Sequence, residues 1–126
     1  MIAFASAFSG FSVDDIDAAE GFYRDVLGLA VHRNAMGILD IDLPGGGRVI
    51  AYPKPDHRPA AFTVLNLVVD DIDAAVDALN AAGVVTKIYT DPDFGTDERG
   101  VSRGRGPDIA WFRDPAGNVL SVIVTD

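Results

Sequence analysis

The chain contains no cysteine, and this absence removes several kinds of chemistry at once. It excludes disulfides, thiolate metal sites and a cysteine nucleophile, and it leaves the redox compartment open. Histidine is nearly as scarce, since His32 and His57 are the only two in 126 residues. A histidine metal site would need both of them to converge with carboxylates. Their places in the sequence argue against this, and we expect two partly exposed surface residues.

Positive charge is also in short supply. Ten Lys and Arg residues face 19 Asp and Glu residues, which gives a formal net charge of -9. Phosphate binding needs a surplus of basic side chains, so neither nucleic acid nor an anionic membrane surface is an expected partner. Long hydrophobic runs are missing as well, and the apolar N-terminus lacks the basic flank of a secretory signal. We therefore expect a cytoplasmic protein.

A repeated heptapeptide is the clearest positive signal. VDDIDAA occurs at Val13–Ala19 and again at Val69–Ala75. An apolar, strand-like run precedes each copy, and apolar residues at helical spacing follow it. Each helical pattern ends at a glycine, Gly28 or Gly83, where a left-handed residue commonly closes a helix. The chain therefore contains one strand–helix module twice.

The aspartates of the repeat suit the start of a helix. Asp15 and Asp71 are the predicted N-caps, and Asp17 and Asp73 fall in the first turn, where carboxylates interact favourably with the helix dipole. Paired carboxylates can also act as acid and base catalysts. We favour the structural interpretation, because the helix starts account for all four residues.

Three further strands are predicted after each helix. They are Leu29–Arg33, Gly37–Leu43 and Arg48–Tyr52 in the first half, and Val84–Tyr89, Asp108–Arg113 and Val119–Val124 in the second. Each half is then β-α-β-β-β. The predicted fold is α+β, a single domain over residues 1–126 built from a first module at 1–56 and a second at 60–126.

Three motifs carry a family resemblance: VDDIDAAEGFYRDVLGL at Val13–Leu29, VVDDIDAAVDALNAAGV at Val68–Val84 and WFRDPAGNVLSV at Trp111–Val122. With them the chain resembles the vicinal oxygen chelate superfamily, which includes glyoxalase I, extradiol dioxygenases, bleomycin-resistance proteins and fosfomycin-resistance enzymes. The resemblance covers essentially the whole chain. It implies two modules whose sheets curl around a shared cavity, with helices outside, commonly in a homodimer.

Enzymes of this superfamily hold a divalent metal through His or Glu residues of the first and last strands, as the resemblance implies. Counting back from the aspartate that starts each helix puts the two first-strand positions on Phe8 and Val64. The last-strand position falls on Ser121 in module two and near Ile50 or Tyr52 in module one. None of these side chains is an imidazole or a carboxylate, so we expect neither a metal nor another cofactor.

The same strand positions predict which residues line the cavity, because side chains alternate between the two faces of a strand. The expected ligand-binding residues are Phe8, Tyr52, Val64, Asn66, Trp111 and Ser121. Asn66 interrupts an apolar strand, and its amide can bind a ligand or fasten a neighbouring strand. Trp111 can form an aromatic wall or simply pack in the core. The pocket is thus apolar and aromatic with few polar groups, as is usual for small-molecule sites.

These residues favour a metal-independent protein that binds a small molecule, similar in type to the bleomycin-resistance proteins and working as a homodimer. The ligand and the presence of catalysis remain open. One alternative is a metal-dependent lyase, isomerase or dioxygenase with a non-standard site that uses Asp40, Asp42 or Glu98. Another is a structural dimer whose cavity is filled by aromatic side chains. The arginine-containing segment from Asp91 to Gly106 is either a lid that captures an anionic group or a solvated loop.

Overall fold

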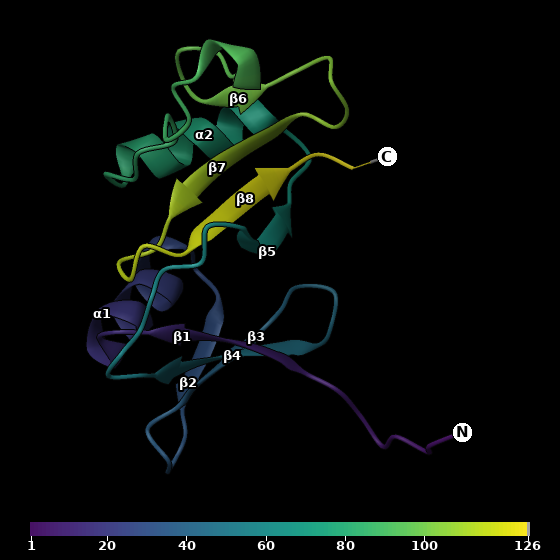
Figure 1. The fold of residues 1–126 in the computed structure, drawn as a ribbon, viewed down its shortest axis with the longest axis vertical. Coiled ribbons are helices and arrows are strands. Elements are labelled where there is room, and N and C mark those ends of the chain that lie inside the picture. The colour runs from purple at the N-terminus through teal and green to yellow at the C-terminus, as the bar shows by residue number, and fades with distance from the viewer. Residues whose placement is uncertain (126) are drawn as a thin grey trace. The chain divides into compact units, whose positions relative to one another are not determined.

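Two compact units make up the protein, whose computed structural model describes residues 1–125. Unit 1 comprises Met1–Pro59 and unit 2 comprises Ala60–Asp126. Each unit contains one four-stranded sheet and one main helix (Figure 1). The fold class is therefore α+β, as the sequence predicts.

Unit 1 follows the expected order of elements. Its elements are β1 Ser9–Val13, α1 Ile16–Gly21, the π-helical turn η1 Phe22–Val26, β2 Ala30–Arg33, β3 Leu39–Asp42 and β4 Arg48–Pro53. The strands lie in the order β1-β4-β3-β2. β1 runs parallel to β4, while β2 with β3 and β3 with β4 are antiparallel.

Unit 2 repeats this topology. Its elements are β5 Thr63–Val68, α2 Ile72–Ala81, the 3-10 turn η2 Pro92–Phe94, β6 Val101–Ser102, β7 Ile109–Arg113 and β8 Val119–Ile123. The strands lie in the order β5-β8-β7-β6, with β5 parallel to β8. The duplicated β-α-β-β-β module is thus confirmed. None of the helices in residues 1–125 is long and apolar enough to cross a membrane.

Both helices begin at the predicted aspartates. The Asp15 carboxylate accepts hydrogen bonds from the backbone N–H groups of Asp17, at 3.0 Å, and Ala18, at 3.1 Å. The Asp71 carboxylate accepts one from Ala74 N at 3.1 Å. A side-chain acceptor here satisfies a backbone donor that has no partner within the helix. The N-cap interpretation of the repeat is confirmed.

The first helix does not stay α-helical to its end. It widens into the π turn, in which Leu27 N donates to Phe22 O at 3.0 Å. The turn places Tyr23 fully inside unit 1, where its ring lies 5.8 Å from the ring of Phe11 and 5.3 Å from that of Phe22. Apolar spacing alone does not distinguish a π turn from one more α turn.

One predicted strand is wrong. Residues 84–89 form no strand, and β6 at Val101–Ser102 occupies that place in the sheet. The segment is held by side-chain bonds instead, since the Thr86 hydroxyl lies 2.7 Å from the carbonyl oxygen of Arg99. The backbone also approaches closely at this point: a Cβ on Gly100 would lie 1.9 Å from Thr86 O. The β-branched run Val84–Thr86 therefore has strand propensity without a ladder partner.

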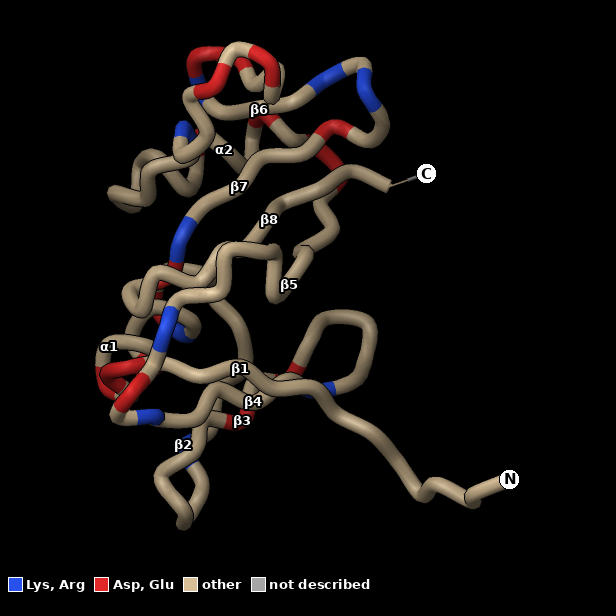
Figure 2. The backbone as a smooth tube through the Cα atoms, viewed as in Figure 1, with Lys and Arg blue, Asp and Glu red and all other residues tan. Residues whose placement is uncertain are grey.

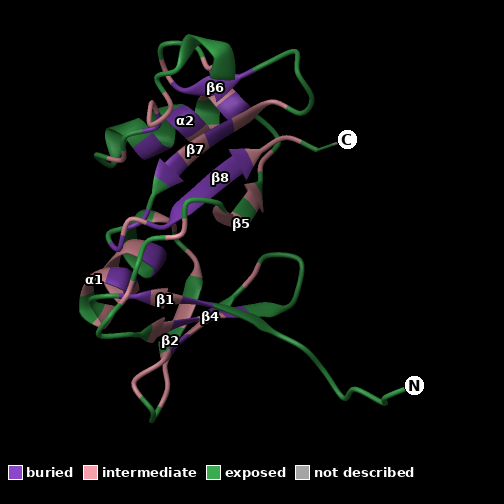
Figure 3. Ribbon diagram, in the orientation of Figure 1, coloured by how far each residue is buried: buried purple, intermediate pink, exposed green. Residues whose placement is uncertain are grey.

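The core of each unit lies between its sheet and its helix. Fully buried residues include Val13, Leu39, Ile41 and Ala51 in unit 1, and Val76, Ala110, Phe112 and Leu120 in unit 2 (Figure 3). Full burial of one large apolar side chain contributes about 1.5–3 kcal/mol. Charged residues gather on helices and loops, and β1, β5 and β8 carry none (Figure 2).

Candidate functional site

Three of the predicted site residues form one row across the sheet of unit 2. Asn66 on β5 is aligned with Ser121 on β8, and Ser121 is aligned with Trp111 on β7. Aligned residues of neighbouring strands project from the same face of a sheet. α2 contacts β7 and β8, and the exposed Asn66 identifies the row as belonging to the face opposite the helix. We call this side the open face of unit 2.

A hydrogen bond fixes the polar end of this row. Ser121 Oγ donates to Asn66 Oδ1 at 2.6 Å, and Ser121 is fully buried. The carbonyl oxygen of the Asn66 amide is thus occupied, and the Nδ2 amino group is the part of the amide that can bind something else. Within the described residues of unit 2, this Nδ2 has no hydrogen-bond partner. Asn66 thus fastens the neighbouring strand and also presents a donor on the open face.

Aromatic rings surround the other end of the row. The ring of Trp111 lies 5.3 Å from that of Tyr89 and 5.1 Å from that of Phe94, and both pairs meet edge to face. Tyr89 and Phe94 are 4.5 Å apart. None of the three is buried, and Phe94 is 40% exposed. We call these three residues the aromatic cluster.

Sequence reasoning missed Tyr89 and Phe94. Tyr89 was assigned to the strand that does not form, and Phe94 lies in the segment read as irregular. The available signal was compositional: two aromatic residues stand close together in an otherwise polar, glycine-containing segment. Such a pattern indicates a contact, but it does not name the partner.

Val64 does not follow the simple alternation used to place it. The register of β5 against β8 shifts between Thr63 and Leu65, so Val64 lies in a bulge. A bulge adds one residue to one strand and breaks the period of two. Counting along the sequence therefore does not determine the face to which Val64 belongs.

In unit 1, Tyr52 lies beside a second polar pair. Ser12 on β1 is aligned with Tyr52 on β4, so both project from one face of the sheet. Ser12 Oγ lies 2.7 Å from His57 Nδ1. His57 is partly exposed, as expected, but its bond to Ser12 was not predicted, because the two residues are distant in sequence. The arrangement places a hydroxyl, an imidazole and a phenol in the same part of unit 1.

Phe8 lies just outside the sheet. The sequence places it within the first strand, but β1 begins at Ser9, and Phe8 is 66% exposed. β4 is the strand that pairs with β1, and it begins at Arg48, directly after the glycine-rich turn. The pairing of the two strands begins with Ser9 opposite Val49, and Phe8 precedes it. As a strand residue Phe8 is a wrong prediction, and its contact with a ligand remains a prediction.

The arginines of the segment Asp91–Gly106 are engaged within unit 2. Arg99 pairs with Asp73 at 2.8 Å and also with Asp77, and Arg103 pairs with Asp73 at 2.6 Å. The hydrogen bond from Arg99 holds the pKa of the Asp73 carboxyl below its usual range, and the same bond raises the pKa of Arg99. These pairs favour a loop fastened to α2 over a lid that captures an anion.

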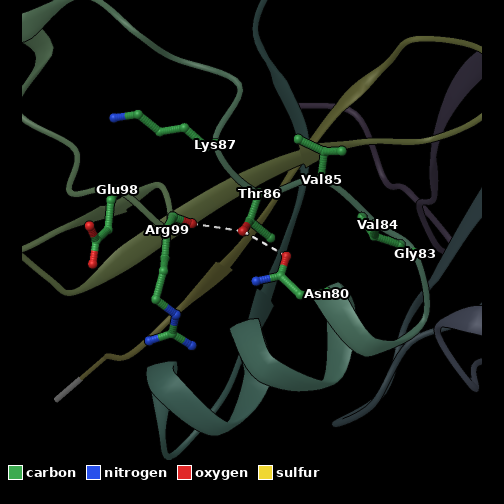
Figure 4. A pocket seen from close by; sticks show the side chains of 8 residues that line it. All are labelled: Asn80, Gly83, Val84, Val85, Thr86, Lys87, Glu98 and Arg99. Carbon is green, nitrogen blue, oxygen red and sulfur yellow. Dashed lines mark hydrogen bonds between the residues drawn. The ribbon is translucent and has the colours of Figure 1, made fainter.

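A surface depression of about 340 Å³ lies beside the C-terminal end of α2 (Figure 4). It is lined by Asn80, Gly83, Val84, Val85, Thr86, Lys87, Glu98 and Arg99. The Thr86 hydroxyl lies within hydrogen-bond distance of both Asn80 Oδ1 and Arg99 O, and Lys87 Nζ donates to Thr96 O at 3.1 Å. None of the six predicted ligand-binding residues lines it. Of the residues of the alternative interpretation, Glu98 does.

Comparison with known families agrees with this architecture. A sequence model of the glyoxalase/bleomycin resistance protein/dioxygenase superfamily matches residues 6–122. The chain belongs to this superfamily. No curated protein matches the sequence.

Solved structures of the superfamily share the fold. A member from Sphaerobacter thermophilus has 25% identity and a TM-score of 0.72, covering 97% of this chain and 98% of its own. An antibiotic-binding protein from a Streptomyces species has 24% identity and a TM-score of 0.67, covering 98% and 100%. The genomically encoded fosfomycin resistance protein of Listeria monocytogenes has 13% identity and a TM-score of 0.70, covering 100% and 96%.

The residues at the positions that the resemblance assigns to metal ligands do not fit a metal. Phe8 and Val64 offer no donor atom, and the Ser121 hydroxyl already donates to Asn66. The protein ligands of catalytic divalent metals are mainly carboxylate, imidazole and thiolate groups.

Each carboxylate of the alternative interpretation has its surroundings within its own unit. Asp40 Oδ1 is 3.5 Å from Asn34 Nδ2, and Asp42 pairs with Arg48 at 3.4 Å. Glu98 belongs to the depression of unit 2. Across residues 1–125, no group of three or more His, Asp or Glu side chains is close enough to hold a metal ion.

Proposed function

We propose that this superfamily member is a metal-independent protein that binds a small molecule on an apolar, aromatic surface. The observation that carries the proposal is the chemistry of the metal positions. Phe8, Val64 and Ser121 stand where the resemblance implies His or Glu ligands, and none of them is suited to a divalent cation. Apolar side chains at these positions suit an organic ligand better than a metal ion.

The ligand-binding residues of the proposal are Phe8, Tyr52, Val64, Asn66, Trp111 and Ser121. Support comes from the row of Asn66, Ser121 and Trp111, which places a hydrogen-bonding group beside an aromatic ring. A single domain of two modules, 1–56 and 60–126, is part of the same proposal. A cytoplasmic location remains a prediction.

A homodimer completes the proposal. The segment Met1–Phe8 supports it, because this segment lies outside the sheet of unit 1 and exposes Met1, Ile2, Phe4 and Phe8 (Figures 1 and 3). It carries no charged side chain. Exposed apolar patches on soluble proteins commonly mark association surfaces. A second copy of the chain is the partner that we assign to it.

Native mass spectrometry of protein purified without chelator tests the function. The proposal predicts a dimer without stoichiometric divalent metal, which retains small molecules when it is mixed with a panel of them. One tightly bound divalent ion for each pair of modules would overturn it. Protein that retains no small molecule from the panel would overturn it as well.

A metal-dependent lyase, isomerase or dioxygenase is the second candidate. One observation favours it: His32 on β2 is aligned with Asp40 on β3, so an imidazole and a carboxylate share one face of unit 1. Two such groups are fewer than the three protein ligands usual in catalytic metal sites. If this candidate holds, His32→Ala will lose a metal that the unsubstituted protein retains.

A further inference from the structure

We propose that Tyr89 and Phe94 are ligand-contact residues, and that the open face of unit 2 takes a flat aromatic ring system with a carbonyl or similar hydrogen-bond acceptor at its edge. This inference rests on the proposed function and names the class of ligand. It depends on the geometry of the aromatic cluster and on the orientation of the Asn66 amide.

The aromatic cluster keeps ring surface available to a ligand. Its three rings contact one another at centroid distances of 4.5–5.3 Å, yet none of the residues is buried. A flat aromatic ligand can extend this edge-to-face and offset packing, which contributes beyond the burial of area alone. Aromatic residues whose role is only to fill the core are normally buried, whereas these three are not.

The loop that carries Tyr89 and Phe94 is held in place. Thr96 Oγ1 donates to Tyr89 O at 2.9 Å, and Phe94 N donates to Asp91 O at 3.0 Å. Arg105 donates to Asp93 O at 2.8 Å, which fastens the far side of the η2 turn. Rings positioned in advance lose little conformational entropy when a ligand binds.

The Asn66 amide determines the polar requirement of the site. Its Oδ1 accepts from Ser121, so its Nδ2–H groups face the open side as donors. A ligand atom at this point must therefore accept a hydrogen bond. A carbonyl oxygen in the plane of an aromatic ring system accepts such a bond. Only β8 separates the strands of Asn66 and Trp111, so one flat ligand of several fused rings can contact both.

Charge on the same face is compatible with an anionic substituent. Arg113 stands two residues after Trp111 on β7, so both side chains project from one face. Arg113 is exposed, and within the described residues of unit 2 it forms no ion pair. A ligand that carries a sulfonate or carboxylate is therefore not repelled here, although the whole chain has a net charge of -9.

Calorimetric titration with two matched probes tests the inference. Anthraquinone-2-sulfonate has the flat rings and the carbonyl acceptors, whereas anthracene-2-sulfonate has the rings and the sulfonate without the carbonyls. We expect both to bind and to quench the fluorescence of Trp111, which is the only tryptophan. We expect the quinone to bind roughly three- to tenfold more tightly, because it gains one hydrogen bond.

Variants test which residues provide the ring contact and which provide the hydrogen bond to the quinone. Phe94→Leu should weaken both probes roughly three- to tenfold, whereas Phe62→Leu, at an exposed phenylalanine outside the aromatic cluster, should leave both unchanged. Asn66→Ala should abolish the preference for the quinone, and Asn66→Asp, which replaces the donor by an acceptor, should do the same.

Several results would overturn the inference. These are a failure of both probes to bind, equal effects of Phe94→Leu and Phe62→Leu, or a quinone preference that survives in both Asn66 variants. If the probes fail while native mass spectrometry finds other small molecules retained, only this inference is lost. If the protein retains no small molecule at all, the proposed function is lost with it.

Discussion

At the scale of single residues, equivalent aspartates of the two repeat copies make different numbers of hydrogen bonds and ion pairs. Asp15 accepts two backbone hydrogen bonds at the start of α1, whereas Asp71 accepts one at the start of α2. Asp17 lies beside Arg33, and Asp73 lies beside Arg99 and Arg103. Helix capping and ion pairs therefore account for four of the six aspartates of the repeat, and the other two, Asp14 and Asp70, directly precede the caps.

Removing either cap should destabilise the protein. Asp15→Ala and Asp71→Ala should each lower the free energy of unfolding by about 1 kcal/mol, because one or more backbone donors lose their acceptor. Urea unfolding followed by circular dichroism measures this. Asp14→Ala and Asp70→Ala are the matched controls, since these aspartates precede the caps. Equal losses at cap and control positions would contradict the assignment.

Gly100 should be far less replaceable than Gly104. Both have positive φ, +87° and +78°, so alanine at either position costs about 1–2 kcal/mol of backbone strain. Only at Gly100 would the added Cβ also collide with Thr86 O. Gly100→Ala should therefore lower the midpoint of thermal unfolding clearly further than Gly104→Ala. Similar midpoints for the two variants would show that the close approach is absent.

At the scale of elements, the loop after residue 96 is fastened to α2 by charge. Arg99 and Arg103 both reach Asp73, in the first turn of the helix. Such exposed pairs are individually weak, and they are screened by salt. They fasten the later part of the segment between α2 and β7, whose earlier part carries Tyr89 and Phe94.

This fastening should weaken in acid. The Asp73 pKa is lowered in the folded protein, chiefly by the hydrogen bond from Arg99. The pair therefore stabilises the folded state above the unfolded pKa of about 3.9, and this stabilisation is lost as the pH falls through the folded value. Titration of the carboxyl carbon by NMR should give Asp73 a pKa below its usual range, and Arg99→Gln should raise it towards that range, with Arg103 still beside the carboxyl. A normal pKa in the unsubstituted protein would refute the pairing.

Helices and strands could be predicted from the sequence where the spacing of apolar residues is compatible with only one type of element. The helices and the strands of unit 1 follow from apolar spacing, capping aspartates and glycine turns. The pattern failed at residues 84–89, because strand propensity does not say whether a ladder partner exists. The period of two holds for Asn66, Ser121 and Trp111, which are aligned in one row, and their contact with a ligand stays a prediction. A bulge interrupts the period at Val64, and the ring contacts of Tyr89 are set by loop packing, which no periodic pattern encodes.

At the scale of the whole molecule, the two units share one topology but differ in their chemistry. The open face of unit 2 carries an amide donor and the aromatic cluster. Unit 1 carries a serine–histidine pair beside a tyrosine. Duplication preserved the scaffold, while the residues at each face diverged.

The proposed dimer predicts an effect of charge in the N-terminal segment. Phe4→Glu should convert dimer to monomer, because it places a carboxylate in an apolar contact between copies. Light scattering coupled to size-exclusion chromatography measures the mass. Met36→Glu, at another exposed apolar residue, should leave the dimer intact. A dimer that tolerates Phe4→Glu, or dissociates equally with Met36→Glu, would contradict the assigned surface.

The central claim is binding without metal, and the dependence of ligand affinity on metal tests it most directly. Affinity for anthraquinone-2-sulfonate, or for a ligand found by native mass spectrometry, is measured after chelator treatment and again with added Mg²⁺, Mn²⁺, Fe²⁺, Ni²⁺ or Zn²⁺. The account predicts the same dissociation constant in every case. Binding that disappears with the chelator and returns with one of the metals would contradict it.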